Sequence, residues 1–401
     1  MTTEQSIDWA PRTDEVRMGD RSLFPSLEPF AYLNHAAISP ASSEVRRGVA
    51  ELLESYAARG LGAFMGYLAQ RERLRGQLAR LIGARPEELA LMPSTTRTVV
   101  DTALCMPWQA GDRVVCLSGE FPANVTPWQR AAELFDLEIV MLDVEAFRSD
   151  QGLDSLRQEL ERGVRLVAVS AVQFQTGLAM PLAEITRLTH AAGGQVFVDA
   201  IQGLGVVPMD VRELGIDYLG CGSQKWLMGM EGAGFLYVRP GCKLVPRVAG
   251  WLSHEEPLRF LFEGAGHLRY DRPIRDEPNF LESGAINAMG FVALEASVAA
   301  IAHLGVPAIF EHVQRYHDAL EPALLERGFT SERHPTQRSG ILACHPPQNV
   351  NAAALVESLN ARGVACTQPD GRVRFAPHWP NSLDEVPRVI GALDAALEAA
   401  P

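Results

Sequence analysis

The stretch Val196-Phe-Val-Asp-Ala-Ile-Gln-Gly-Leu-Gly205 is an apolar run that ends abruptly on an acid, Asp199. A second stretch, Gly220-Cys-Gly-Ser-Gln-Lys-Trp-Leu227, places Lys225 in a glycine-broken turn just after another apolar run. Both apolar runs predict buried strands. In an open α/β sheet, ligands bind outside the carboxyl ends of the strands. An acid at one strand end and an amine after the next therefore predict a ligand site.

Lysine is scarce in this chain: of 36 Lys and Arg residues only Lys225 and Lys243 are lysines. A general bias towards arginine explains most of this scarcity. Arginine cannot form an imine because its guanidinium stays protonated, whereas a desolvated lysine can. Lys243 lies in Pro240-Gly-Cys-Lys-Leu-Val-Pro246, which is typical of a surface loop. Lys225 is therefore the lysine expected to do any covalent chemistry.

Composition excludes several classes of function. The chain has 401 residues, enough for two domains, and its net charge of −13 argues against nucleic acid or an anionic membrane as main partner. Residues 1–8 lack the basic and apolar regions of a signal peptide, and the longest apolar helix candidate, 285–301, contains Asn287 and Glu295. The six cysteines are scattered without a C-x-x-C pair, and no H-E-x-x-H spacing occurs. We expect reduced thiols, a cytoplasmic protein, no membrane span and no metal site.

The order of the predicted elements indicates an α/β protein. Residues 1–30 are polar and predict an N-terminal arm. From residue 31 to about 275, near-continuously apolar strands alternate with helices, which predicts one large doubly wound domain with a mostly parallel sheet. Residues 251–279 within this range predict an irregular surface segment. Residues 276–401 carry long helices followed by short strands and predict a smaller α+β domain.

Small hydroxyl residues stand between a predicted strand, Glu88 to Met92, and a predicted helix that begins in Ser94-Thr-Thr-Arg-Thr-Val-Val100. Backbone N–H groups and hydroxyls converge at such a helix start and form a phosphate cradle. The simpler alternative is that Ser94 or Thr95 only caps the helix. Together with Asp199 and Lys225, however, the cradle fits pyridoxal phosphate. This cofactor needs a lysine for its aldehyde, a carboxylate for its ring nitrogen and a helix N-terminus for its phosphate.

On these residues the sequence resembles the class V aminotransferase family of pyridoxal phosphate enzymes, which includes cysteine desulfurases, kynureninase and isopenicillin N epimerase-like proteins. The resemblance runs from Tyr32 to about Asp384. It is most specific in Val198-Asp-Ala-x-Gln202, in the Ser-x-Lys-Trp around Lys225 and in residues 232–238. It implies fold type I, with a large cofactor domain, a small domain made of the N-terminal arm and the C-terminal part, and a homodimer with sites at its interface.

The resemblance also implies roles for the residues that bind the cofactor. Lys225 matches the Schiff-base lysine and Asp199 the carboxylate that binds the pyridine nitrogen. Other positions match parts of the family's cofactor site as follows: Gln202 lies near the phenolic oxygen, Thr95 and Thr96 form the phosphate-binding turn, and Ser223 and Gln224 are further phosphate candidates. Gln224 stands where the family usually has a histidine.

Phe121 falls at the position that stacks on the pyridine ring, although core packing explains an aromatic there equally well. An Asn that contacts the phenolic oxygen in desulfurases aligns with Phe174, and Gln173 is expected to replace it. The stretch 282–287 resembles the segment that reaches the other subunit's phosphate, with Ala285 where the family usually has Thr.

The resemblance places the substrate through three residues. Arg374 matches the arginine that binds the substrate carboxylate, and a two-point arginine–carboxylate pair suits an α-amino acid. Asn34 and His35 match the loop that lines the substrate pocket.

We therefore predict an enzyme that acts on an α-amino acid through a Lys225 aldimine and is best matched to a class V aminotransferase. C–S or C–C lysis and epimerisation use the same Cα carbanion and stay open as alternatives. Desulfurase chemistry is disfavoured, because Phe121 cannot transfer a proton as a histidine would and residues 367–373 contain no cysteine. The neighbouring Cys366 is expected to be structural. Two rival classes are a non-catalytic dimeric module of the same fold and a nucleotide-binding domain, which would lack a G-x-G-x-x-G or P-loop signature.

Overall fold

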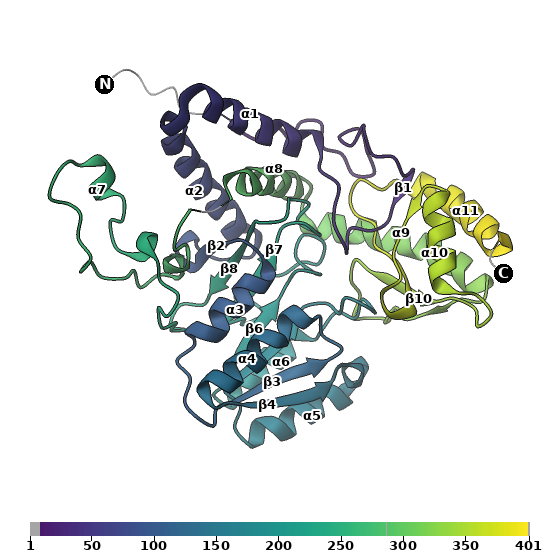
Figure 1. Cartoon of the computed structure of the whole chain (residues 1–401). Helices are drawn as coiled ribbons and strands as arrows, with labels where there is room; N and C mark the ends of the chain where they lie inside the picture. The colour runs from purple at the N-terminus through teal and green to yellow at the C-terminus, as the bar shows by residue number, and fades with distance from the viewer. Residues whose placement is uncertain (1–8, 286, 400–401) are drawn as a thin grey trace.

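A computed structural model gives the structure of the protein and describes residues 9–285 and 287–399. Residues 1–8 of the predicted arm, residue 286 of the stretch 282–287, and residues 400 and 401 lie outside the described residues. A seven-stranded sheet forms the centre (Figure 1). Its strands, in spatial order, are β2 (Leu89–Met92), β8 (Gly234–Val238), β7 (Tyr218–Gly222), β6 (Gln195–Asp199), β5 (Leu166–Ser170), β3 (Arg113–Ser118) and β4 (Glu138–Asp143).

Only β8 runs against its neighbours in this sheet, since β8 pairs antiparallel with both β7 and β2. The pairs from β7 through β6, β5 and β3 to β4 are all parallel. The prediction of a mostly parallel α/β sheet is confirmed. The carboxyl ends of β3, β5, β6 and β7 therefore meet at one edge.

Helices cover both faces of the sheet, which explains why its strands are almost continuously apolar. Along β3, Val115 and Leu117 pack into one core, whereas Val114 and Cys116 pack into the other, as the pleat of a strand requires. The helices of the first core include α2 (Phe64–Leu81), α5 (Asp150–Glu161) and α6 (Leu182–Ala191). Those of the second are α3 (Thr95–Cys105) and α4 (Thr126–Phe135).

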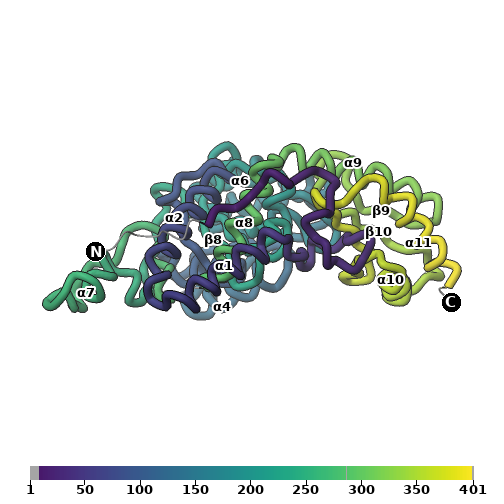
Figure 2. The backbone as a smooth tube through the Cα atoms, turned by 90° about the horizontal axis from the view of Figure 1, so that it is seen from above, coloured from purple at the N-terminus to yellow at the C-terminus, as the bar shows by residue number. Residues whose placement is uncertain are grey.

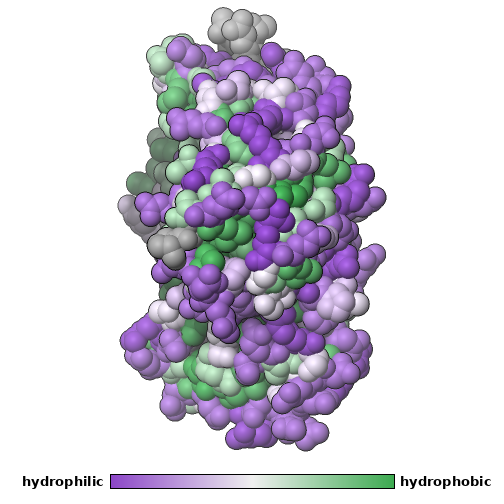
Figure 3. Space-filling model, turned by 90° about the vertical axis from the view of Figure 1, so that its right-hand side faces the viewer, coloured by the Kyte–Doolittle hydropathy of each residue, from purple (hydrophilic) through white to green (hydrophobic). Residues whose placement is uncertain are grey.

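A separate hydrophobic core lies at the other end of the molecule, where the C-terminal part of the chain gathers (Figure 2). Its strands are β9 (Thr330–Ser331), β10 (Leu342–His345) and β12 (Val373–Phe375), which form an antiparallel sheet, and β1 (Ala31–Tyr32), which pairs parallel with β11 (Val364–Ala365). Its helices are α9 (Val306–Glu326), α10 (Ala352–Ala361) and α11 (Val386–Ala399). On the face shown in Figure 3, hydrophobic residues form small groups among hydrophilic ones.

The predicted domain boundary between residues 275 and 276 stays a prediction, and two elements pack across it. Helix α8 (Ala288–Leu304) lies against α1 (Ser43–Arg59) and α2, and its Phe291 and Leu294 belong to the core of the large sheet. Strand β1, by contrast, pairs with β11 of the C-terminal part. Packing thus favours grouping α8 with the large sheet and β1 with the small sheets.

Residues 251–279 form an irregular segment, as expected, with three short turns of helix: η5 (Trp251–Ser253), α7 (Arg259–Phe262) and η6 (Pro278–Leu281). The part around α7 projects from the body of the molecule (Figures 1 and 2). Within the described ranges no single helix is long and apolar enough to cross a membrane. Only α8 and α9 together meet that criterion, and they are bent by 79°.

Candidate active site

The two residues that defined the sequence site lie on adjacent strand ends. Asp199 is the last residue of β6 and is paired in register with Gly220 of β7, five residues before Lys225. Asp199 is 2% exposed, and its Oδ1 accepts the Ile201 N–H at 2.9 Å. Burial raises the pKa of Asp199 to about 6, against the effects of the Ile201 hydrogen bond and the Lys225 charge. Such a carboxyl, far from water, gains from a cationic ligand.

Lys225 is also desolvated. Burial lowers the pKa of its amine to about 8, the charge of Asp199 opposes this shift, and the charge of Arg374 adds to it. A lysine with this pKa is neutral in a far larger fraction of molecules at neutral pH than a surface lysine. The neutral amine is the form that attacks a carbonyl and that accepts a proton.

Three hydrogen bonds fix the backbone of the turn that carries Lys225. The Ser39 hydroxyl donates to the Lys225 carbonyl at 2.6 Å, and the Ser39 N–H donates to the Gln224 carbonyl at 2.7 Å. His378 Nε2 donates to the Trp226 carbonyl at 2.9 Å. Segments from both ends of the chain therefore hold this turn.

His35 lies behind the Lys225 turn and is only 1% exposed. Its Nδ1 is 2.7 Å from Ser39 Oγ, and its ring contacts those of Tyr32, Trp226 and His378. Burial holds the pKa of His35 well below its usual value. The predicted contact of His35 with the substrate has no exposed surface to make it, so His35 acts on the site through Ser39.

Asn34 and Arg374 lie on one side of the site and are linked by Thr367. The Thr367 hydroxyl donates to Asn34 Oδ1 at 3.1 Å and accepts from Arg374 Nη2 at 3.3 Å. Arg374 Nη1 donates to the Phe174 carbonyl at 2.6 Å. Arg374 is 5% exposed, and burial lowers its pKa to about 10.

Arg374 has unused binding capacity. Its Nε is buried and has no hydrogen-bond partner in the described part of the chain, and no carboxylate there forms an ion pair with it. A buried guanidinium without a counter-charge is costly unless a ligand supplies one. A carboxylate on the substrate would do so with matching geometry.

At the N-terminus of α3 the predicted cradle is present, with separate duties for its residues. Ser94 is the helix cap, since its Oγ accepts the Arg97 N–H at 3.1 Å. Thr95 Oγ1 accepts the Gly222 N–H at 2.8 Å, which joins the helix start to the end of β7. Thr96 is exposed, so its hydroxyl and the free N–H groups of the first turn are available to a phosphate.

Of the two further phosphate candidates, Gln224 faces this cradle and Ser223 does not. A Cβ on Gly222 would stand 2.8 Å from Gln224 Oε1 and 3.1 Å from Thr95 Oγ1, so the Gln224 amide lies beside the helix start. Ser223 is fully buried, and its hydroxyl donates to the Met230 carbonyl in a close contact. The predicted phosphate contact of Ser223 would require this hydroxyl to turn away from Met230.

Phe121 is 48% exposed, which does not fit the core-packing alternative. The centre of its ring lies 5.6 Å from Lys225 Nζ, and its edge meets the ring of Phe174 with 5.3 Å between centres. An aromatic face is thus presented next to the amine, where a flat heteroaromatic ring can stack.

Gln202 and Gln173 differ in the donors that they leave free. Gln202 Nε2 donates to the Ala36 carbonyl at 3.0 Å, and its Oε1 accepts from Trp226 Nε1 at 2.9 Å. Gln173 is 2% exposed, and its Nε2 has no partner within the described residues. Gln173 therefore carries the free amide donor, whereas one N–H of Gln202 is already used.

Sequence reasoning missed four side chains of this site. They are Ser39, Glu120, Ser170 and Thr367, each of which is hydrogen-bonded to a predicted site residue or its flanking backbone. Glu120 alone gave a signal, because it directly precedes Phe121 after a strand end. The residues present fit pyridoxal phosphate on three structural points. These are the unpaired Asp199, the unpartnered Gln173 amide and the open start of α3 beside Gln224.

The fold and this site define a pyridoxal phosphate-dependent enzyme. Comparison with known families narrows the class further. Residues 31–373 match the model of the family Aminotransferase class-V, and the chain belongs to that family.

Individual relatives span almost the whole chain. An "Uncharacterized aminotransferase YcbU" from Bacillus subtilis (strain 168) is 27% identical over 379 residues, which are 94% of this chain and 96% of the relative. A cysteine desulfurase from Enterobacter sp. (strain 638) is 30% identical over 296 residues, which are 71% of this chain and 70% of the relative. Among solved structures, the cysteine desulfurase CsdA from Escherichia coli superposes with a TM-score of 0.81 at 25% identity, covering 95% of this chain and 98% of that chain.

Proposed function

We propose that the enzyme removes the amino group of an α-amino acid as an aminotransferase. The observation that carries this proposal is the buried Arg374 guanidinium without a carboxylate partner, on the same site as Lys225 and Asp199. An α-carboxylate bound there would place the substrate amine and Cα towards Lys225.

Lys225 holds the cofactor through its amine and is the group placed to move the proton at the substrate Cα. When bound, pyridoxal phosphate supplies an electron sink for the negative charge that develops at Cα. Asp199 keeps the ring nitrogen protonated, Phe121 covers one face of the ring, and Gln173 donates to the phenolic oxygen. Thr95, Thr96 and Gln224 hold the phosphate, while Asn34 and Thr367 orient Arg374.

Desulfurase chemistry is not supported, although several relatives are named cysteine desulfurases. That chemistry needs an accessible thiolate. Cys366 is 2% exposed, and burial raises its pKa to about 12. Cys221, near Lys225, is also buried, and burial raises its pKa well above the usual value. The name of the Bacillus relative, an aminotransferase, agrees with transamination.

The proposal includes a homodimer in the cytoplasm. Family resemblance supports a dimer, and so does the exposure of Thr96 and Phe121 at the phosphate end of the site, where a second subunit could complete it. The free state of all six cysteines suits a reducing compartment. Light scattering after gel filtration would give twice the mass of 43.8 kDa for a dimer and would contradict the proposal at a single mass.

The visible absorption spectrum tests the cofactor assignment, with Lys225→Ala as the matched variant. Native protein should show a protein-bound band after mixing with pyridoxal phosphate, and the variant should not. A panel of amino acids, given without an amino acceptor, then separates the reactions. A transaminase releases one 2-oxo acid per site, a lyase turns over repeatedly and an epimerase yields the D-isomer. Repeated turnover or a D-isomer would refute transamination.

A further inference from the structure

Glu120 is a buried carboxyl at the site to which the proposed function gives no role. It follows β3 and directly precedes Phe121, and it is 8% exposed. Gly119 before it has a φ of +83°, a left-handed conformation that turns the chain at this point. The side chain of Glu120 therefore points into the protein while that of Phe121 points outward.

The Glu120 carboxyl is bound to the end of β5. Its Oε1 accepts the Ser170 N–H at 2.6 Å, and its Oε2 accepts the Ser170 hydroxyl in a close contact. Ser170 is the register partner of Asp199 in the pairing of β5 with β6. The turn that carries Phe121 is thus tied, through one residue, to the strand end beside Asp199.

Glu120 and Asp199 share an unusual electrostatic situation. The described residues contain seven buried carboxylates, and five of them form ion pairs with arginine. These five are Glu88, Asp101, Asp217, Glu282 and Glu295. Glu120 and Asp199 have no ion pair with a described residue, and their charges interact with each other.

Burial raises the pKa of Glu120 to about 7, and the charge of Asp199 adds to this rise. Polar and titratable groups face Glu120 from four sides: Ser170 from β5, Asp199 from β6, Asn124 from the turn before α4, and Cys116 from β3. None of these is a cation. A positive charge must come from a ligand if both carboxyls are to be ionised together.

We propose that Glu120 is a positioning residue for the cofactor. Its carboxyl holds the turn of Phe121 against β5 and, as a second buried acid beside Asp199, supports positive charge on the cofactor's ring nitrogen. This inference rests on the proposed function, because it needs pyridoxal phosphate at Lys225. Since Glu120 is already buried in the free chain, the main change that the cofactor brings to it is that charge.

The test compares the dissociation constants of pyridoxal phosphate for the native chain and for Glu120→Gln between pH 6 and pH 8.5. Glutamine keeps the size and the Ser170 contacts but has no charge. Ionised Glu120 attracts the positive ring nitrogen, so the native chain should gain affinity relative to the variant by about threefold or more as the pH rises. Titrations of Lys225, Asp199 and the cofactor are common to both proteins and cancel in the ratio.

Glu295→Gln is the matched control, because Glu295 is a fully buried carboxyl with a raised pKa that pairs with Arg73 on α2, away from the site. Its affinity ratio to the native chain should not change with pH. Glu120→Ala, which also removes the anchor of the turn, should weaken cofactor binding by about tenfold and alter the visible circular dichroism of the bound cofactor.

The outcomes are distinguishable. Absence of a bound band in the native protein refutes the proposed function. A bound band with a ratio for Glu120→Gln that stays constant across the pH range overturns the role of Glu120. Should that variant fail to fold, Ser170→Ala tests the same point, since the Ser170 hydroxyl lowers the pKa of Glu120. Its loss should move the pH-dependent gain in affinity to higher pH, and an unmoved profile would overturn the proposal.

Discussion

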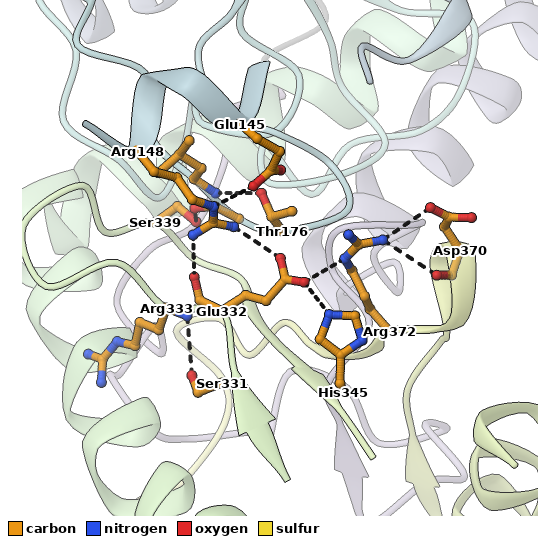
Figure 4. A network of polar contacts seen from close by, with 12 residues as sticks. Glu145, Arg148, Thr176, Ser331, Glu332, Arg333, Ser339, His345, Asp370 and Arg372 are labelled. Carbon is orange, nitrogen blue, oxygen red and sulfur yellow. Dashed lines mark hydrogen bonds and ion pairs between the residues drawn. The ribbon is translucent and has the colours of Figure 1, made fainter. Parts of the chain in front are cut away.

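Two groups of charged residues in this molecule are built on opposite plans. At the cofactor site Asp199, Lys225 and Arg374 are buried, and no salt bridge joins any of them to a described residue. At the second group, Glu332 accepts hydrogen bonds from Arg148 and Arg372 and contacts His345 closely (Figure 4). There every charge has a partner of opposite sign or a hydrogen bond.

The Glu332 group joins the two cores of the molecule. Arg148 ends η4 (Val144–Arg148), beside the large sheet, whereas Glu332 follows β9 and Arg372 precedes β12, the strand that carries Arg374. Arg372 also pairs with Asp370. Paired charges here hold two parts together, while the unpaired charges of the cofactor site are left for ligands. The difference between the two groups separates a structural cluster from a binding site without reference to any relative.

The largest expected effect comes from removing the amine of the unpaired group. Lys225→Ala should lower kcat by roughly 10²–10⁴-fold beyond any loss of cofactor, because the proton at Cα loses its acid and base. Added small primary amines should restore part of the rate. Steady-state kinetics at saturating cofactor measures both, and unchanged turnover would remove Lys225 from the mechanism.

Arg374→Met tests whether the unpaired arginine serves a ligand. Loss of the carboxylate contact should lower kcat/KM by about 2–5 kcal/mol. Stability without substrate should not fall, because the variant removes a buried cation that lacks a counter-charge. Denaturant unfolding beside kinetics checks this, and a destabilised variant with normal kcat/KM would assign Arg374 to the structure.

Asp199→Asn changes the pH dependence of stability in the cofactor-free chain. The folded pKa of Asp199 is raised to about 6, so the folded state binds more protons than the unfolded one between about pH 4 and pH 6. Native stability from this group is complete below that window and is lost as the pH rises through it, by at most about 3 kcal/mol. The Asn variant should lack this loss. Parallel pH profiles for the two proteins, measured by urea unfolding, would contradict the assignment.

Glu332→Gln should give the smallest effect and the opposite pattern. It weakens hydrogen bonds from two arginines at a partly buried position, which should cost about 1–3 kcal/mol of the free energy of unfolding. Cofactor affinity should stay within about twofold of the native value, because Lys225 and Asp199 are not touched. A stable variant with impaired cofactor binding would end the distinction between the two groups.

Local pattern was enough to predict the sheet, its helices and the strand ends that carry Asp199 and Lys225. Apolar periodicity and glycine turns report on neighbours in sequence, and these elements depend on such neighbours. The contact of Ser39 with Lys225 spans 186 residues, and that of Arg374 with Phe174 spans 200. Nothing near either residue encodes such contacts, so they could not be read from the sequence.

Burial of single polar residues was equally beyond the pattern. His35 and Ser223 stand in motifs that predict contact with ligands, yet neighbouring elements cover both. Helix α8 follows a predicted domain boundary but packs against α1 and α2, because its apolar surface finds its partners there. Tertiary packing decided these points.

The pairing of β1 with β11, and the bridge between Asn34 and Ala376, bring the two ends of the chain together at the site. During synthesis the N-terminal segment leaves the ribosome first, but its partners are made last. The turn of Lys225 therefore waits for Ser39 and His378 to meet around it until nearly the whole chain has emerged. Capture of the cofactor is in this sense a signal that the polypeptide is complete, and a chain that stops short of residue 376 cannot give it.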